Sequence, residues 1–260
     1  MNNISLSVIM PALNEERNIQ EAVLSTLSAF NDYGVNGEII VVNDGSSDAT
    51  KQLVEEISKD HKHVRLIDHH RPMGIGYSFM DGVRKAHGDV VVMFPGDNEN
   101  DPNDAVSFFK LMDQVDVVIP FVHNIEVRNK VRRTISSLYR FIINMSFGIN
   151  LNYTNGTVFY RRCILDNVEI NSKGFFYQAE LLIRLLRKGY LYAEVPNFLS
   201  KRNTGKSKAI SFKSLMNVMK NYLMLVYRIH ILRVESRRQY RKLAQNSVSY
   251  TKYNSLHTGR

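Results

Sequence analysis

The chain has 260 residues, of which 44% are hydrophobic and 23% charged. This composition suits one large domain, or one domain with an appendage, and excludes wholesale disorder. The single cysteine, Cys163, excludes an internal disulfide and a zinc cluster of several cysteines, and it fits a reducing compartment best. The first residues show no secretory signal pattern, and no apolar run approaches the roughly 20 residues that span a bilayer. We therefore expect neither a signal peptide nor a transmembrane helix.

The formal net charge of +9 is unevenly distributed along the chain. Residues 201–260 contain 14 lysines and arginines and a single acid, Glu235, whereas residues 1–200 carry a net charge of −4. A mildly acidic body thus precedes a strongly basic C-terminal quarter. Such a quarter suits a nucleic acid, an anionic membrane surface or a phosphate-rich ligand, and composition alone does not choose among them.

Short apolar runs alternate with helical patterns over the first 200 residues. The runs predict strands at residues 6–10, 38–42, 64–67, 90–94 and 116–119, and the apolar spacing predicts helices at residues 18–30, near 53–57 and at 76–86. Residues 90–94 are apolar throughout, as expected of a strand buried on both faces. This alternation predicts an α/β fold with a Rossmann-like, doubly wound, mostly parallel sheet.

The second half of the chain is more basic, and its predicted elements are a helix at 175–189, a strand at 192–195 and a helix at 212–234. The last helix is predicted to be amphipathic, with these apolar residues on one side: Leu215, Val218, Met219, Tyr222, Leu223 and Val226. The tail after Glu235 is basic and polar, and we expect it to be poorly ordered. We therefore divide the chain into a main domain, residues 1–212, and a C-terminal helix and tail, residues 213–260.

Polar clusters follow the first, second and fourth predicted strands, where ligands bind in doubly wound sheets. Asp44 stands before Gly45, and the glycine permits a tight turn. The Asp44 carboxylate can accept hydrogen bonds from a base or a ribose. Capping the next helix is the alternative role of this loop, and Asp48 suits that role better. Asp97 and Glu99 could hold a hard divalent cation together with substrate phosphates, or could form an acidic turn.

Glycines and cations supply further candidate phosphate ligands. Residues 73–76 (MGIG) look like a phosphate-binding fragment, but they lack the rest of a dinucleotide or Walker A signature. Two basic clusters suit phosphate recognition because arginine forks bind phosphate oxygens bidentately, with a solvated surface as the alternative for both. The clusters are Arg128, Arg132 and Arg133, and Arg202, Lys206 and Lys208. The histidines at positions 61, 63, 69, 70 and 87 show no metal-ligand spacing and are expected on the surface.

Four blocks in collinear order resemble the family 2 glycosyltransferases, in particular the branch of polyprenyl-phosphate (dolichyl-phosphate) sugar synthases. They are residues 8–19 (VIMPALNEERNI), residues 40–50 (IVVNDGSSDAT), residues 74–102, and residues 176–181 (FYQAEL) continuing to 194–196 (EVP) and 202–208 (RNTGKSK). The resemblance spans about residues 4–212. It implies a GT-A fold, a nucleoside-diphosphate-sugar donor and inverting transfer.

The resemblance also implies a role for individual residues. Those that would line the nucleotide pocket are Pro11, Asn14, Glu15, Asp44 and Gly74. Those that would meet the donor diphosphate and a Mg²⁺ or Mn²⁺ ion are Asp97 and Glu99. Those that would face the acceptor phosphate are Arg128, Arg132 and Ser136, and Arg202 and Lys206 would close over the donor diphosphate.

Two departures from the family pattern affect the expected chemistry. Pro95 replaces the first acid of the usual Asp-x-Asp motif, which removes one carboxylate and leaves metal dependence open. Gln178 stands where many relatives that glycosylate hydroxyl groups carry a catalytic base, and an amide cannot take a proton. Glu180, two residues further on, is the alternative base, with a structural role at the helix start as its other interpretation.

These departures favour a phosphate acceptor. A sugar hydroxyl must lose a proton as it attacks and needs a general base, whereas a phosphate is already ionised near neutral pH. We therefore predict transfer from a nucleoside-diphosphate sugar to a lipid-linked phosphate, polyprenyl phosphate above all, with these candidate catalytic residues: Asp97, Arg128, Arg132 and Glu180. The helix at 212–234 and the six basic residues within 228–242 predict peripheral contact with an anionic membrane surface, on its cytoplasmic side.

Three other functions compete with this prediction. The protein could be a family 2 enzyme acting on a saccharide hydroxyl, or a non-catalytic nucleotide-sugar-binding protein, which Pro95 motivates. Nucleic-acid binding through the basic tail is disfavoured because no nucleic-acid motif is present. The sequence leaves open which sugar and nucleotide are used and whether the chain forms a homo-oligomer.

Overall fold

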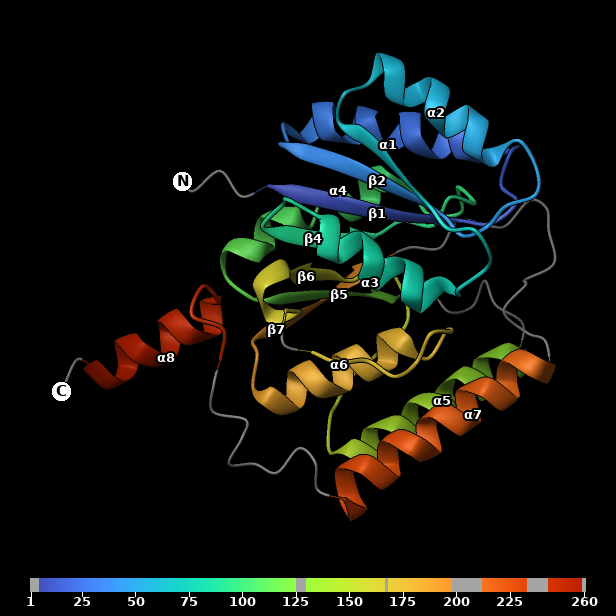
Figure 1. The fold of residues 1–260 in the computed structure, drawn as a ribbon. Helices are drawn as coiled ribbons and strands as arrows, with labels where there is room; N and C mark the ends of the chain where they lie inside the picture. Colours follow the sequence, from blue (N-terminus) through green and yellow to red (C-terminus); the bar gives the residue numbers. More distant parts are fainter. Residues whose placement is uncertain (1–4, 125–129, 167, 198–211, 233–242, 259–260) are drawn as a thin grey trace.

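The computed structural model describes residues 5–124, 130–166, 168–197, 212–232 and 243–258, and its centre is one seven-stranded sheet (Figure 1). The strands are β1 (Leu6–Ala12), β2 (Gly37–Asn43), β3 (Val64–Asp68), β4 (Val90–Met93), β5 (Val117–Val122), β6 (Phe159–Arg161) and β7 (Tyr192–Asn197). Their order across the sheet is β3-β2-β1-β4-β6-β5-β7.

Helices connect these strands. The longer ones are α1 (Ile19–Tyr33), α2 (Thr50–Asp60), α3 (Ile75–Lys85), α5 (Lys130–Phe147), α6 (Tyr177–Lys188), α7 (Phe212–Val226) and α8 (Val248–Thr258). The short ones are α4 (Pro102–Val106) and the 3₁₀ turns Phe109–Asp113 and Arg162–Ile164, and a π-helical turn, Tyr227–Ile231, follows α7. The predicted strands and helices are present, with ends that differ by a few residues.

The sheet is mostly parallel, as the sequence predicted. Strand β1 lies between β2 and β4, so that Ile9 pairs with Ile40 on one side and with Met93 on the other. Strand β6 runs antiparallel to both β4 and β5. The sequence did not predict β6, because three residues are too few to show a strand periodicity. Apart from β6, all strands end at the same edge of the sheet, which is termed the carboxyl edge below.

Each face of the sheet packs against its own helices (Figure 1). Residues of α1, α2 and α4, among them Val23 and Val54, form one core with the sheet. Residues of α3 and α6, among them Phe79 and Leu182, form a second core on the other face. This two-sided burial explains why the central strands are almost wholly apolar.

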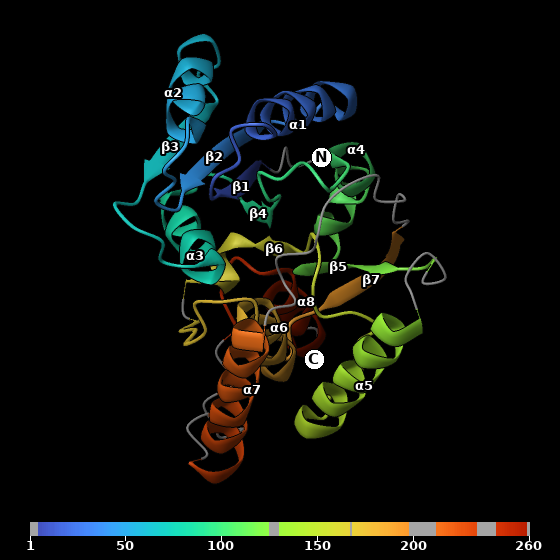
Figure 2. The same cartoon turned by 90° about the vertical axis from the view of Figure 1, so that its right-hand side faces the viewer.

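A further layer covers the outer side of α6. Ile143 and Phe147 of α5 pack with Ile183 of α6 and with Leu225 of α7. Helix α6 is therefore buried on both sides, and every residue from Tyr177 to Leu185 is buried. Figure 2 shows α5 and α7 on the side of α6 that faces away from the sheet. No helix within the described residues has both the length and the apolar character needed to cross a membrane.

The end of the chain corrects one prediction. The tail was expected to be poorly ordered, but residues 243–249 pack against the body and α8 is a regular helix that begins there. The carboxylate of Asp116, fully buried at the start of β5, accepts hydrogen bonds from the backbone N–H groups of Val248 (2.8 Å) and Ser249 (2.9 Å). The Arg161 guanidinium lies 3.3 Å from the same carboxylate. These bonds cap the first turn of α8, a long-range contact that no local sequence pattern reveals.

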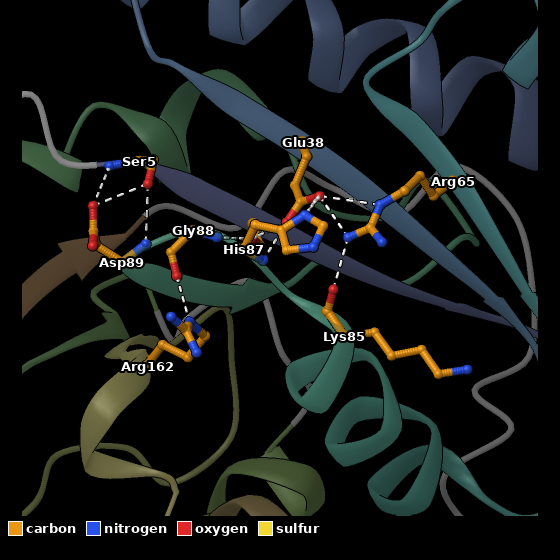
Figure 3. Close-up of polar contacts among 9 residues, drawn as sticks. Ser5, Glu38, Arg65, Lys85, His87, Gly88, Asp89 and Arg162 are labelled. Carbon is orange, nitrogen blue, oxygen red and sulfur yellow. Dashed lines mark hydrogen bonds and ion pairs between the residues drawn. The ribbon is translucent and has the colours of Figure 1, made fainter.

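Opposite the carboxyl edge, where the strands begin, a network centres on Glu38 of β2 (Figure 3). Its Oε1 accepts hydrogen bonds from the Ser7 hydroxyl (2.6 Å) and from the His87 N–H (2.7 Å), and its Oε2 lies 2.6 Å from the Arg65 guanidinium. Arg65 also donates to the carbonyl of Lys85 (2.7 Å). Burial by itself would raise the pKa of Glu38, but these hydrogen bonds outweigh it and lower the pKa below its ordinary value. The network joins β2 to β1, to β3 and to the turn before β4.

Candidate active site

Three loops meet at the carboxyl edge, one after each of the strands β1, β2 and β4. The N–H of Asp44 donates to the carbonyl of Ala12 (2.8 Å), and the N–H of Gly96 donates to the carbonyl of Pro11 (3.0 Å). A Cβ at Gly96 would lie 2.9 Å from the terminal methyl group of Ile19, so a larger residue would require that side chain to shift. The predicted polar clusters after these strands are therefore brought together, with the β1 loop in the middle.

The β1 and β2 loops are joined through Asn14. Its backbone is left-handed (φ 56°), a conformation that asparagine tolerates better than most residues. The Asn14 side-chain oxygen accepts a hydrogen bond from the Ser47 N–H (2.8 Å), and the Asn14 N–H donates to the Ser46 hydroxyl (3.0 Å). Asn14 thus sets the distance between the two loops, and contact with a nucleotide stays a prediction.

Glu15 and Asp48 continue this junction towards the start of α2. The N–H of Glu15 donates to the Thr50 hydroxyl (2.9 Å), and its carboxylate accepts a hydrogen bond from the Asn18 side chain (2.9 Å). Asp48 accepts from the Thr50 N–H (3.0 Å), although Ala49 occupies the N-cap position. Asp48 therefore stabilises the first turn of α2, in keeping with the capping role predicted for it.

Asp44 binds the loop that precedes α3. Its Oδ1 accepts hydrogen bonds from the Met73 N–H (2.8 Å) and pairs with His69 Nδ1 (2.9 Å), while its Oδ2 accepts from the Gly74 N–H (2.9 Å). Burial favours a higher pKa, but these hydrogen bonds prevail and the pKa of Asp44 lies below its ordinary value. The ionised carboxylate thus caps the N-terminus of α3, where negative charge is stabilising. Asp44 positions the loop, and its contact with a bound nucleotide stays a prediction.

Two glycines permit this close packing of loops. Gly45 has φ 75°, and a Cβ there would lie 2.5 Å from the backbone of Arg71. Gly74 has φ 98°, and a Cβ there would lie 2.6 Å from the carbonyl oxygen of Lys173. The N–H of Gly74 is bound by Asp44, and that of Gly76 by the Lys173 carbonyl (2.9 Å). The glycine fragment therefore serves loop packing, and these two N–H groups are not directed at a phosphate.

His69 is a site residue that the sequence analysis missed, since it was expected on the surface. Only 10% of its side chain is exposed, and it lies between two carboxylates, Asp44 at 2.9 Å from Nδ1 and Asp81 at 3.4 Å from Nε2. Its ring also makes an edge contact with Tyr77, with ring centroids 5.4 Å apart. One signal was available: His69 follows the third strand directly, at the same edge as the other polar clusters.

The predicted metal turn follows β4. Asp97 is half-buried, Glu99 is exposed, and the Glu99 N–H donates to Asp97 Oδ1 (3.2 Å). Asn98 between them has a left-handed backbone (φ 55°). Carboxylate oxygens suit Mg²⁺ or Mn²⁺, which often take one or two protein carboxylates and leave the remaining positions to phosphates and water. Among the described residues no third His, Cys, Asp or Glu completes a cluster around them.

Glu180 and Gln178, the two residues considered at the position of a base, are both buried in α6. The Glu180 carboxylate, 2% exposed, accepts hydrogen bonds from the Ser172 N–H (3.0 Å) and from the Arg184 guanidinium (2.8 Å). The Gln178 amide donates to the Gly156 carbonyl (2.6 Å) and accepts from the Gly156 N–H (3.1 Å). Both side chains hold neighbouring loops, which favours the structural interpretation of Glu180. Its role as a proton acceptor stays a prediction.

The predicted cationic ligands are mostly beyond what the structure describes. Arg128, Arg202 and Lys206 lie outside the described residues, and of Arg132 only the backbone, in the first turn of α5, is described. Arg133 and Ser136 lie on α5 and are half-buried. Their proposed contacts with phosphates stay predictions.

A known family model matches the part of the sequence that forms this sheet edge. The sequence profile described as Glycosyl transferase family 2 matches residues 7–175, which is more than half of the chain. The chain belongs to glycosyl transferase family 2. As a family member it has the GT-A fold that the sequence blocks predicted, with the C-terminal helix also present.

Solved structures agree with this fold. The chain is similar to glucosyl-3-phosphoglycerate synthase from Mycobacterium tuberculosis in complex with UDP, with a TM-score of 0.64 and 22% identity, covering 86% of this chain and 80% of that one. A structure of the same synthase with Mn²⁺, UDP-glucose and phosphoglyceric acid has a TM-score of 0.62, 22% identity and the same coverage. At these identities the similarity establishes the fold alone.

Curated relatives in the family are named for a lipid-phosphate acceptor. An undecaprenyl-phosphate 4-deoxy-4-formamido-L-arabinose transferase of Pectobacterium carotovorum subsp. carotovorum (strain PC1) is 28% identical over 223 residues, covering 84% of this chain and 66% of that protein. A transferase of the same name from Shewanella sediminis (strain HAW-EB3) is 26% identical, covering 82% of this chain and 64% of that protein. The matched region thus spans about two thirds of the length of these relatives.

Proposed function

We propose that this protein is an inverting glycosyltransferase that moves a sugar from a nucleoside diphosphate to a lipid-linked phosphate, polyprenyl phosphate in particular. The observation that carries the proposal is the burial and full engagement of Glu180 and Gln178. Membership of glycosyl transferase family 2 and the relatives named for undecaprenyl phosphate support it.

A phosphate acceptor suits a site without a base at this position. Attack by a sugar hydroxyl requires removal of its proton, which a general base must accept. A phosphate monoester is already an anion near neutral pH, so one of its oxygens can attack the anomeric carbon without proton transfer. The new C–O bond forms as the bond to the nucleoside diphosphate breaks, and the diphosphate leaves with the bonding electrons. Attack opposite the leaving group inverts the anomeric centre.

Positive charge is then the main catalytic requirement, because acceptor and leaving group are both anionic. We assign Arg128, Arg132 and Ser136 to the acceptor phosphate, and Arg202 and Lys206 to the donor diphosphate, by their resemblance to family positions. Asp97 and Glu99 would hold a divalent ion, which would neutralise charge on the diphosphate. Mn²⁺ accompanies UDP-glucose in the solved synthase named above, which supports this assignment.

The donor base and ribose are assigned to the three-loop site. Pro11, near the end of β1, and Asn14 and Glu15, on the loop that follows it, would line one wall. Asp44 would shape the opposite wall through its bonds to Met73 and Gly74. A donor complex would test whether its carboxylate also contacts the nucleotide. His69, which pairs with Asp44, belongs to this wall as a positioning residue.

Radiolabelled transfer provides the direct test. The purified protein is incubated with polyprenyl phosphate and each common nucleotide sugar, with and without Mg²⁺ or Mn²⁺, and organic-phase product is counted. We expect a lipid product with at least one donor, and loss of that product when Asp97 is replaced by asparagine. A Lys59→Gln variant, which removes an exposed cation in the last turn of α2, is the matched control and is expected to retain transfer.

The rival functions give different results in the same assay. A water-soluble glycan product without any organic-phase label would establish a saccharide-hydroxyl acceptor and overturn the proposal. Calorimetric binding of a nucleotide sugar with no transfer to any acceptor would favour the non-catalytic binder that Pro95 motivates.

A further inference from the structure

Helices α5 and α7 leave an unusually large set of apolar side chains exposed. Of the 21 large hydrophobic side chains that are exposed among the described residues, 13 lie on α5 or within residues 212–232. On α5 they are Ile135, Leu138, Phe141, Ile142 and Met145, and on the C-terminal segment they are Leu215, Met216, Met219, Leu223, Met224, Tyr227, Ile231 and Leu232. Single exposed apolar residues need no explanation, but such a concentration marks an interaction surface.

These side chains are exposed although their helices are firmly packed. The inner sides of both helices contribute Phe147 and Leu225 to a common core with α6. The Ser146 and Tyr222 hydroxyls are 2.8 Å apart, and His230 Nε2 lies 2.7 Å from the Ser146 carbonyl oxygen. The predicted apolar side of the C-terminal helix is thus divided, with Val218 and Tyr222 towards the body and Met219 and Leu223 exposed. The exposed residues of α5 and of residues 212–232 are called the α5–α7 face below.

We propose that the α5–α7 face docks on an anionic lipid bilayer, with its apolar side chains at the level of the headgroups and upper acyl chains. The charge of the two segments selects this occupant. Residues 130–147 contain four lysines and arginines, residues 212–232 contain three, and neither segment contains an aspartate or glutamate. Arg140 and Lys220 are exposed beside the apolar residues. The negative surface potential of an anionic leaflet attracts each such cation, in addition to the gain from apolar burial.

A second copy of the chain fits this face less well. Pairing two α5–α7 faces would bring basic residues together without any acid on either segment to compensate them. Anionic lipids supply the missing negative charge and also accept the long apolar side chains. The surface differs from the sequence prediction in one respect: it is formed by two helices, whereas the C-terminal helix alone was expected to contact the membrane.

The position of the face relates it to the site. Helix α5 follows β5 and α7 follows β7, and both strands run towards the carboxyl edge with β1 and β4. Both helices lie together at the end of the molecule remote from α2 (Figure 1). Docking would thus hold the carboxyl edge close to the bilayer in which a polyprenyl phosphate resides. This last consequence rests on the proposed function, whereas the docking itself does not.

Vesicle sedimentation tests the docking without requiring catalysis. The full chain is mixed with vesicles of phosphatidylcholine and phosphatidylglycerol, and with vesicles of phosphatidylcholine alone. We expect sedimentation with the anionic vesicles, weakened by salt, and much less with the neutral ones. Two double variants, Phe141→Gln with Met145→Gln on α5 and Met219→Gln with Leu223→Gln on α7, are each expected to lower the partition coefficient by at least about tenfold.

The matched control is Leu24→Gln with Leu256→Gln, which removes two exposed leucines on α1 and α8. It should bind vesicles as the wild type does, and all variants should keep the wild-type thermal midpoint because the altered side chains are exposed. Absence of sedimentation, or unchanged binding by both double variants, would overturn the proposal. So would a dimer in sedimentation velocity that the same variants convert to monomer, since a second copy would then cover the face.

Docking and transfer can fail separately in this design. A short, water-soluble prenyl phosphate serves as acceptor in the absence of vesicles. Transfer to it without vesicle binding would refute the docking and leave the proposed function intact. Vesicle binding without transfer to any prenyl phosphate would refute the proposed function and leave the docking intact.

Discussion

The two ends of strand β2 carry carboxylates in contrasting surroundings, Glu38 near its start and Asp44 directly after its end. Both carboxyl groups have a lowered pKa, because hydrogen bonds outweigh burial. Glu38 lies 2.6 Å from Arg65, a permanent cation, whereas Asp44 is bound by His69 and by the N–H groups of a loop. A carboxylate thus joins neighbouring strands at one edge of the sheet, and a second carboxylate fixes the conformation of a loop at the other edge.

This contrast separates stability from function. The Glu38 network (Figure 3) joins β2 to its neighbours and to the turn before β4, where the strands begin, opposite the carboxyl edge. The Asp44 contacts fix the start of α3 and the wall of the proposed donor pocket. Substitutions at the first edge should alter unfolding alone, and substitutions at the second should alter transfer as well.

The largest effect is expected for Asp44→Asn. An amide retains one acceptor oxygen but directs N–H donors at the N–H of Met73 or Gly74, so the loop must shift. We expect kcat/KM for transfer to fall about 100-fold, because a shift of about 1 Å in a group that positions the substrate has an effect of this size. We also expect the free energy of unfolding to fall by about 1–3 kcal/mol. Steady-state kinetics and denaturant unfolding measure the two effects. Full activity in a destabilised Asp44→Asn protein would show that this loop does not shape the donor site.

Gly74→Ala and Gly88→Ala each introduce a steric clash, the first at the carboxyl edge and the second at the opposite edge, and so compare the roles of the two edges. A Cβ would lie 2.6 Å from the Lys173 carbonyl oxygen at Gly74, and 2.7 Å from the Ser7 nitrogen at Gly88. Both variants should lose about 2 kcal/mol or more of stability, Gly74→Ala also because its φ is positive. Only Gly74→Ala should raise the dissociation constant for the nucleotide, measured by calorimetry. Equal weakening of nucleotide binding by both variants would mean that the edges are not independent.

Glu38→Gln is expected to have a moderate effect confined to stability. The amide keeps the shape of the side chain but loses the charge opposite Arg65 and one acceptor oxygen. We expect unfolding free energy to fall by about 1–2 kcal/mol with kcat and KM unchanged. Glu55→Gln, an exposed acid on α2, is the matched control and should change neither quantity. A lowered kcat in Glu38→Gln would contradict the division between the edges.

The smallest effect is a pH dependence. The pKa of Glu38 is lowered from its ordinary 4.5, so its ionised form stabilises the fold above pH 4.5, and this contribution is lost as pH falls through the lower folded value. The stability difference between wild type and Glu38→Gln should therefore be constant near neutrality and shrink below pH 4.5. Denaturant unfolding from about pH 7 to about pH 3.5 measures this difference. A difference that grows on acidification would refute the assigned direction.

Much of the fold was accessible from local patterns. Strand β4 could be predicted because two buried faces require a continuous apolar run, and α1 because its apolar residues recur with helical spacing. Strand β6 could not, because three residues show no periodicity. The anchoring of the start of α8 was also missed, because it depends on Asp116, more than 130 positions earlier in the chain.

The candidate site shows the same division. Sequence predicted which loops would meet, since the carboxyl ends of parallel strands share one edge. It did not show that Asp44 turns towards Gly74, that His69 lies between two acids, or that Glu180 is bound by Arg184. Side-chain direction depends on the surrounding packing, which local residue spacing does not encode.

The sequence by itself determined the mostly parallel α/β architecture, the membership of the glycosyltransferase family and the basic character of the C-terminal quarter. Period, turn residues and charge are properties of short segments and can be identified without a structure. Only the tertiary structure decided which carboxylates are engaged and which apolar side chains of α5 and α7 stay exposed. Both outcomes depend on contacts between distant segments, because burial and hydrogen-bond pairing are fixed when the layers pack together.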